Sequence, residues 1–307
     1  MPVVDLDRIS KSYSNKVAVR ELSLRIEPGT MFGLLGPNGA GKTSTIRMMV
    51  GMTLPDSGTV RLFDEPFCRD HLRRVGYLPE ERGLYKRMKV IDQLVFMGQL
   101  HGLDRATAAA RARQWCERMD IDESMEKKTQ ELSKGMQQKI QFIATLLHDP
   151  ELIIMDEPSS GLDPVNVSLL EQILLDLKSK GRTILFSTHR MEQVEKLCDA
   201  ICLVDQGRAV LEGTMRAVKS RYARNRVVVE YAGDASFLTD PSITELRESA
   251  GRAEFKLRDG GDGQALLHAA ARHAQIFKFE LVEPSLEEIF IRTVDRKSTR
   301  LNSSHSS

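Results

Sequence analysis

Short apolar runs rich in β-branched residues alternate with longer amphipathic stretches from Val3 to about Tyr222. The runs Leu152 to Met155 and Thr183 to Ser187 have continuous apolar centres, which is typical of strands buried on both faces of a sheet. Between them, Val167 to Lys180 has a helical pattern, and Pro164 precedes it at a position that favours a helix start. The alternation predicts an α/β domain with a mostly parallel core sheet.

The stretch between Glu80 and Pro150 has a different texture. Strand signals stop there, and helical sequence rich in Ala, Arg, Gln and Met replaces them, including Thr107 to Met119 and Gly135 to His148. We therefore expect a helical lobe at about residues 80–150, inserted into a core sheet that also carries antiparallel edge strands. This first domain is expected to span residues 1–222.

A second change of texture follows the arginine-rich stretch Arg221 to Arg226, which we interpret as a solvated linker. Beyond it lie three strand patterns and two helical ones: Val227 to Tyr231, Ala253 to Leu257, Ile276 to Val282, Gln264 to His273 and Ser285 to Thr293. They predict a small α+β accessory domain at residues 226–294 without catalytic chemistry of its own.

The tail from Asp295 to Ser307 is polar, serine-rich and aperiodic. Such a composition buries too little apolar surface to offset the entropy of ordering, so we expect disorder. The tail also resembles translated cloning sequence, which raises the hypothesis that the native terminus is replaced here.

Charge and cysteine content narrow the classes of partner. The 307 residues include 44 Lys and Arg against 43 Asp and Glu, a formal net charge of +1, so no global field predicts binding to nucleic acid. The four cysteines contain no CxxC pair, which suits a reducing compartment, and Cys198 and Cys202 are expected to be small buried hydrophobes. No leader and no apolar run of about 18 residues is present, which predicts a cytosolic protein unless a partner tethers it.

A phosphate-binding motif carries the strongest chemical signal. The segment G-P-N-G-A-G-K-T fits GxxxxGK[ST], with an apolar strand before it and a helical run after it, as in a P-loop NTPase. Glycines allow backbone N–H groups to converge on phosphate oxygens at a helix N-terminus. The motif predicts ATP binding, with Lys42 on the β- and γ-phosphates and Thr43 on Mg²⁺. The expected nucleotide contacts are Gly36, Pro37, Asn38, Gly39, Ala40, Gly41, Lys42, Thr43 and Ser44.

Two carboxylates follow the buried run L-I-I-M, at the strand end where α/β sheets bind ligands. We expect Asp156 to hold Mg²⁺ and Glu157 to polarise the attacking water as general base. An acidic pair could instead cap the next helix, although the presence of Lys42 favours catalysis.

The segment L-S-K-G-M-Q-Q-K, residues 132–139, resembles the signature of the ATP-binding cassette (ABC) family. Lys134 and Met136 depart from the usual glycine and glutamine of that signature, whereas Ser133 and Gly135 match it. The resemblance implies that Ser133 and Gly135 of one copy bind the γ-phosphate held by a second copy, so that MgATP closes a homodimer. Standing alone, the segment would be an ordinary serine-capped helix.

Four further matches follow the order of the family. Tyr13 occupies the place of an aromatic ring that stacks on adenine, and Glu80 the place where most members have a glutamine that contacts Mg²⁺. Asp163 ends S-G-L-D, which resembles the loop joining the two sites of the dimer, and His189 lies where the family has a histidine on the γ-phosphate. Individually, each has an ordinary structural interpretation, and Glu81 is an alternative to Glu80.

The resemblance covers about Val3 to Tyr222. With G-Y-L-P-E-E-R-G-L-Y and a C-terminal P-S-L-E-E-I-F, the chain is most similar to ATPase subunits of the bacterial sodium-efflux (NatA-like) exporters. That likeness implies a separate membrane-spanning permease subunit, a location on the inner face of the cell membrane, and sodium as a candidate cargo. The alternative is a soluble ABC-type ATPase of translation or DNA maintenance, against which the single cassette and the lack of sustained heptads argue.

Overall fold

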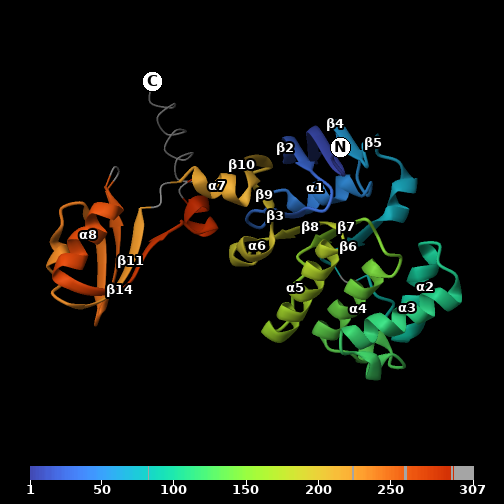
Figure 1. The fold of residues 1–307 in the computed structure, drawn as a ribbon. Helices are drawn as coiled ribbons and strands as arrows, with labels where there is room; N and C mark the ends of the chain where they lie inside the picture. Colours follow the sequence, from blue (N-terminus) through green and yellow to red (C-terminus); the bar gives the residue numbers. More distant parts are fainter. Residues whose placement is uncertain (82, 223–224, 259–260, 292, 294–307) are drawn as a thin grey trace. The chain divides into compact units, whose positions relative to one another are not determined.

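The computed structural model describes residues 1–81, 83–222, 225–258, 261–291 and 293 (Figure 1). These residues form two compact units, Met1–Met215 and Arg216–Ser307, and each is described by itself. The predicted disordered tail at 295–307 lies outside the described residues, as does part of the predicted linker.

A six-stranded sheet in the order β10-β9-β3-β8-β7-β6 forms the centre of the first unit. Its strands are parallel except β10, which pairs antiparallel with β9 and forms one edge. All side chains of the central strands β3, β7 and β8 are buried, which explains their continuous apolar pattern. The predicted α/β class is confirmed. The strand bounds are β3 Met31–Leu35, β6 Val75–Leu78, β7 Leu152–Asp156, β8 Thr183–Thr188, β9 Ala200–Asp205 and β10 Arg208–Thr214.

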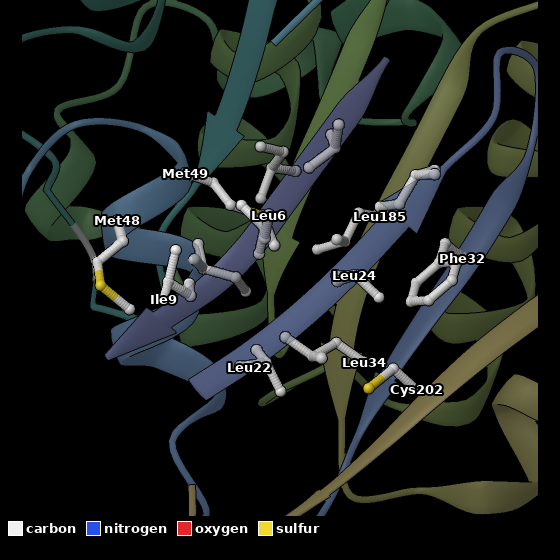
Figure 2. Close-up of a cluster of buried hydrophobic side chains, with 14 of the residues drawn as sticks. Leu6, Ile9, Leu22, Leu24, Phe32, Leu34, Met48, Met49, Leu185 and Cys202 are labelled. Carbon is white, nitrogen blue, oxygen red and sulfur yellow. The ribbon is translucent and has the colours of Figure 1, made fainter. Parts of the chain in front are cut away.

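The remaining antiparallel strands form a sheet of their own, in the order β2-β1-β4-β5, rather than extending the edge of the core sheet. Its apolar face packs with helix α1 against the core sheet. Figure 2 shows this cluster, in which Leu6, Leu24, Phe32, Met49 and Leu185 converge from five different elements. Cys202 lies in the same cluster, and burial raises the pKa of its thiol. The bounds are β1 Val4–Tyr13, β2 Lys16–Ile26, β4 Ser57–Leu62, β5 Glu65–Pro66 and α1 Lys42–Met49.

Helices α2, α3 and α4 contact one another and form the predicted helical lobe (Figure 1). Asp104 caps α3 by accepting a hydrogen bond from Thr107 N, so the helix begins before the predicted residue Thr107. His101 follows α2 and His148 follows α4, and their rings stack with centroids 3.8 Å apart. The guanidinium of Arg118 lies 5.0 Å from the Trp115 ring centroid on α3. The lobe consists of α2 Val90–Leu100, α3 Arg105–Arg118 and α4 Lys134–Leu146, with short 3₁₀ turns at η2 Asp122–Ser124 and η3 Thr129–Glu131.

Two helices complete the first unit: α5 contacts β8, and α6 contacts β3. Asp163 caps α5 and Pro164 occupies its first turn, so this helix begins three residues before the predicted Val167. The remaining bounds of this unit are η1 Arg69–Arg74, α5 Pro164–Ser179 and α6 Met191–Leu197.

The second unit contains an antiparallel sheet in the order β12-β13-β11-β14. Helix α8 covers it, and Leu266 and Ala270 of α8 join the core of the sheet. Residues 286–291 are helical, and Ser285 and Glu288 cap each other reciprocally at that helix start. The bounds are α7 Met215–Ser220, β11 Arg226–Gly233, η4 Ser236–Thr239, β12 Ile243–Ser249, β13 Arg252–Leu257, α8 Gly263–His273 and β14 Ala274–Val282.

The division between the units falls at the start of α7, whereas the sequence placed it after Tyr222. Tyr222 Oη is 2.8 Å from Thr293 Oγ1, and Lys219 forms an ion pair with Glu283. These two contacts, one from α7 and one from just after it, lie within the second unit.

Candidate functional site

The phosphate loop leaves β3 after Leu35 and enters α1 at Lys42. Gly41 has φ +110°, and a Cβ there would lie 2.4 Å from Ala18 O. A Cβ on Gly36 would lie 2.2 Å from Val204 O. Glycine is therefore required at both ends of the loop, which packs tightly on the neighbouring backbone.

The loop forms one wall of a cavity of about 390 Å³. Residues distant in sequence complete it, because the carboxyl ends of parallel strands meet at one edge of the sheet. The lining residues are Tyr13, Lys16, Ala18, Asn38, Gly39, Gly41, Lys42, Thr43, Ser44, Glu80, Asp156 and Glu157. Of the predicted loop contacts, Gly36, Pro37 and Ala40 are not in this lining.

Lys42 is the buried cation of the cavity. Its ammonium donates hydrogen bonds to Gly36 O at 2.8 Å and Pro37 O at 3.2 Å, and lies 4.0 Å from Glu157 Oε1. Burial lowers the pKa of Lys42, while Glu157, Asp156 and Glu80 act in the opposite direction by favouring its charge. A cation held this way can move from weak carbonyl partners to a polyphosphate.

Asp156 ends β7 with its side chain fully buried. One carboxylate oxygen, Oδ1, accepts a hydrogen bond from Ser187 Oγ. The other, Oδ2, is buried and has no hydrogen-bond partner among the described residues. Leaving such an atom unpaired costs about 1–3 kcal/mol, so the site is suited to a cation. Oxygen ligands are the type that Mg²⁺ prefers, and Thr43 lines the same cavity with a hydroxyl.

Glu157 follows Asp156 with φ +50°, a left-handed backbone that a glutamate rarely adopts. Its backbone N donates to the backbone O of Ser187 at 3.2 Å and to its Oγ at 3.3 Å. Its Oε1 lies within hydrogen-bond distance of His189 Nδ1, at 3.0 Å. Unusual backbone of this kind costs about 1–3 kcal/mol and is concentrated at active sites. The turn positions the carboxylate between Lys42 and His189.

Another wall of the cavity comes from β1 and the turn after it. Tyr13 is 42% exposed, so its ring is available for stacking. The end of β1 next to Tyr13 is held by Asp56, whose carboxylate accepts hydrogen bonds from Ser12 N at 2.7 Å and from Lys11 Nζ at 2.6 Å. Lys16 also lines the cavity, close to Gly39, although sequence reasoning did not single it out.

Glu80 lines both the cavity and a neighbouring hollow that extends towards Lys86 and Gln137, whereas Glu81 lines the hollow and not the cavity. Gln141 of α4 holds this segment by donating to the backbone oxygens of Pro79 and Glu81, both at 3.1 Å. The structure thus brings Glu80, not Glu81, to the phosphate loop.

Ser133, Gly135 and Asp163 do not line the cavity. Ser133 Oγ accepts from Met136 N at the start of α4, and Asp163 caps α5. A Cβ on Gly135 would lie 3.6 Å from Gly161 O, so the start of α4 and the loop before α5 lie side by side. Within one chain, these residues form a second group separate from the phosphate cavity.

Ser187 is a second functional candidate that the sequence analysis missed, after Lys16. It contacts both Asp156 and Glu157 from the neighbouring strand β8. The signal was a hydroxyl residue near the carboxyl end of a buried strand, two residues before His189.

Family comparison adds independent evidence. Residues 19–160 match the model of the family described as ABC transporter, and residues 213–294 match that of the C-terminal domain of DrrA1-3-like ATP-binding proteins. The second match covers the predicted accessory domain and assigns no chemistry to it.

The relatives extend over nearly the whole chain. An uncharacterized ABC transporter ATP-binding protein of Bacillus subtilis, YhaQ, is 42% identical over 95% of this chain and 98% of its own length. The Nod factor export ATP-binding protein I of Paraburkholderia xenovorans is 34% identical over 96% and 97%. A solved ATP-binding subunit of an ABC transporter is 27% identical, with a TM-score of 0.67 over 71% of this chain and 92% of that one.

These relatives do not favour the alternative of a soluble ATPase of translation or DNA maintenance. Their names do not mention sodium. Among the described residues, no helix is both long and apolar enough to cross a membrane. The phosphate cavity, the signature segment and the matches along the whole chain agree, and the chain belongs to the ABC transporter family as an ATP-hydrolysing ATP-binding subunit.

Proposed function

We propose that this chain hydrolyses MgATP in the cavity at the phosphate loop and thereby drives export through a separate permease. The observation that carries the chemical part is the arrangement of Asp156 and Glu157. One buried carboxylate oxygen is unpaired, and the adjacent glutamate lies 4.0 Å from the Lys42 ammonium.

Thr43, Asp156 and Glu80 would hold the magnesium ion. All three line the cavity, and Asp156 Oδ2 has no protein partner among the described residues. The bound ion would supply positive charge that offsets the charge of the phosphates. Lys42 would contribute a second positive charge by leaving the carbonyls of Gly36 and Pro37 for phosphate oxygens.

Glu157 would act as general base on the attacking water. Its carboxylate is mostly buried, and the strained turn holds it at the cavity. His189, 3.0 Å from Glu157 Oε1, would orient that carboxylate and reach the γ-phosphate. Its side chain is 58% exposed, so it is free to respond to the nucleotide.

The site would be completed by a second copy of this chain. Ser133 and Gly135 begin α4 but do not line the cavity of their own chain. The helix N-terminus there can bind an anion, and the adjacent loop with Asp163 can connect the two sites. A solved cassette with ADP and phosphate, dimeric by its description, has the same fold, with a TM-score of 0.65.

Export is supported by the relatives described as Nod factor export ATP-binding proteins. A permease would hold the subunit at the cytoplasmic face of the membrane, by contact with the helical lobe near residues 80–97. Sodium is a candidate cargo from sequence likeness, and a Nod factor is a candidate from these relatives.

The test is reconstitution of the chain with its co-purified membrane partner in lipid vesicles. We expect ATP-dependent movement of a cargo, measured for sodium and a Nod factor, and its loss with Glu157→Gln. If the chain hydrolyses ATP but co-purifies with ribosomes or DNA and with no membrane protein, the exporter assignment is wrong and the ATPase assignment stands.

A further inference from the structure

Ser187 lies at the centre of the core sheet, on strand β8 between β3 and β7. It is fully buried and is the register partner of Asp156 across β7 and β8. Paired residues of neighbouring parallel strands present their side chains on the same face of the sheet. The register therefore brings the hydroxyl of Ser187 to the carboxylate of Asp156.

The direction of each hydrogen bond at this hydroxyl is determined. The backbone N–H of Glu157 can only donate, so Ser187 Oγ accepts from it at 3.3 Å. The hydroxyl proton is then donated to Asp156 Oδ1. One side chain thus contacts both acidic residues of the site, and its single donor is used by one oxygen of Asp156.

A buried serine in a sheet is often no more than a satisfied polar group. Thr183, at the other end of β8, is such a case, because its buried hydroxyl accepts from Gly29 N at 3.0 Å, away from the cavity. Ser187 differs in the identity of its partners. Without its hydrogen bond, both oxygens of Asp156 would be unpaired, and the left-handed turn at Glu157 would lose one of two contacts to its N–H.

We propose that Ser187 is a positioning residue for ATP hydrolysis. It holds one oxygen of Asp156 so that the other is free for the metal, and it fixes the turn that presents Glu157 to the attacking water. The inference rests on the proposed roles of Asp156 and Glu157.

The experiment compares Ser187→Ala with Thr183→Val, which also removes a buried hydroxyl from β8. Each full-length variant is titrated with a fluorescent methylanthraniloyl ATP in Mg²⁺ and in EDTA, and its kcat and melting temperature are measured. For Ser187→Ala we expect kcat to fall about 10- to 100-fold, as for a lost hydrogen bond to a charged group. The gain in affinity that Mg²⁺ gives should shrink about 10-fold, with affinity in EDTA unchanged.

Thr183→Val should lower the melting temperature by a similar amount and leave kcat and the Mg²⁺ effect as in the wild type. Ser187→Thr, which keeps the hydroxyl, should restore both. Equal behaviour of Ser187→Ala and Thr183→Val would overturn the proposal, as would a Ser187→Ala defect that appears only in melting temperature.

Asp156→Asn and Glu157→Gln separate this proposal from the function on which it rests. If both abolish hydrolysis while Ser187→Ala does not, Ser187 is a structural residue and the proposed function stands. If neither affects hydrolysis, the proposed function itself fails.

Discussion

Glu157 combines a left-handed backbone, a nearly buried carboxylate and two nitrogen partners, Lys42 and His189. For Glu157→Gln we expect kcat to fall by about two to four orders of magnitude, because the amide keeps the shape but cannot accept a proton. ATP affinity should stay within about two-fold, and size-exclusion with MgATP should show a closed dimer. Glu171→Gln is the control, since Glu171 is also buried but pairs with Lys196 on helix α6. Wild-type turnover in Glu157→Gln would show that Glu157 is not the general base.

Lys42→Ala is expected to weaken nucleotide binding itself, whereas Glu157→Gln affects the hydrolysis that follows it. The mutation removes a buried cation next to the polyphosphate site, where charge-assisted hydrogen bonds are about twice as strong as neutral ones. Nucleotide titration should show at least about a ten-fold weaker affinity. Lys178→Ala, which removes an ammonium paired with Asp199 outside the cavity, should bind as the wild type does. Unchanged affinity in Lys42→Ala would contradict the assignment.

Glu80 offers a carboxylate to the phosphate cavity, and we propose that it contacts Mg²⁺ there. A full charge attracts a cation more strongly than a carbonyl oxygen does, so Glu80→Gln should require more Mg²⁺ for half-maximal hydrolysis. The measurement is ATPase rate against free Mg²⁺, with Glu81→Gln as the matched neighbour that lines the other hollow. Superimposable curves for Glu80→Gln and the wild type would leave Glu80 without a role in hydrolysis.

At this scale the sequence predicted the residues whose chemistry dictates their type and spacing. The phosphate loop needs glycine at Gly36 and Gly41, and the carboxylates need the end of a buried strand. Ser187 and Lys16 could not be found in the same way, because their importance depends on which strand or turn faces the site. A local sequence pattern does not predict the order of the strands in a sheet or the register between them.

Among the elements, the ends of α2 and α4 meet in the stacked pair His101 and His148. Burial, then the charge of His101, lowers the pKa of His148 to about 4. Its Nε2 lies 3.0 Å from Val75 O, and its Nδ1 has no hydrogen-bond partner among the described residues. The surroundings of this pair therefore favour the neutral form of both rings.

Stability should consequently depend on pH in the acid range. The pKa of His148 is near 6.5 in the unfolded chain and about 4 in the folded one, so below 6.5 the unfolded state binds more protons. Stability therefore falls as pH drops from about 6.5 to about 4. Above 6.5 both states are neutral and the effect disappears. Melting temperatures of wild type and His148→Gln at pH 7.5, 5.5 and 4.5 test this. The glutamine can still donate to Val75 O, and its melting temperature should fall less on acidification; parallel curves would exclude His148 as the cause.

The elements with strong periodicity were predicted within a few residues; for example, the predicted strand Thr183 to Ser187 is β8, which ends one residue later, at Thr188. Strand β12 was missed. Its residues Ile243–Ser249 are mostly exposed, so no apolar alternation marks them, and pairing with β13 defines the strand. Strand β10 is an antiparallel edge strand of the core sheet, as predicted, and further antiparallel strands form the sheet β2-β1-β4-β5. Alternation alone does not say which sheet a strand joins.

For the molecule as a whole, the two units predict separable roles. Truncation after Tyr222 should leave a folded protein that binds ATP within about two-fold of the full chain, because every residue lining the cavity belongs to the first unit. Nucleotide titration and size-exclusion would check it. A truncated protein that folds but does not bind nucleotide would show that the proposed division of labour is wrong.

Trp115 is the single tryptophan of the chain, and it lies on α3 in the helical lobe, next to Arg118. Intrinsic fluorescence excited at the red edge therefore reports on that lobe and is blind to the accessory domain. A melt followed by tryptophan emission and one followed by calorimetry will coincide only if the units unfold together. The chain thus contains its own optical probe of the helical lobe.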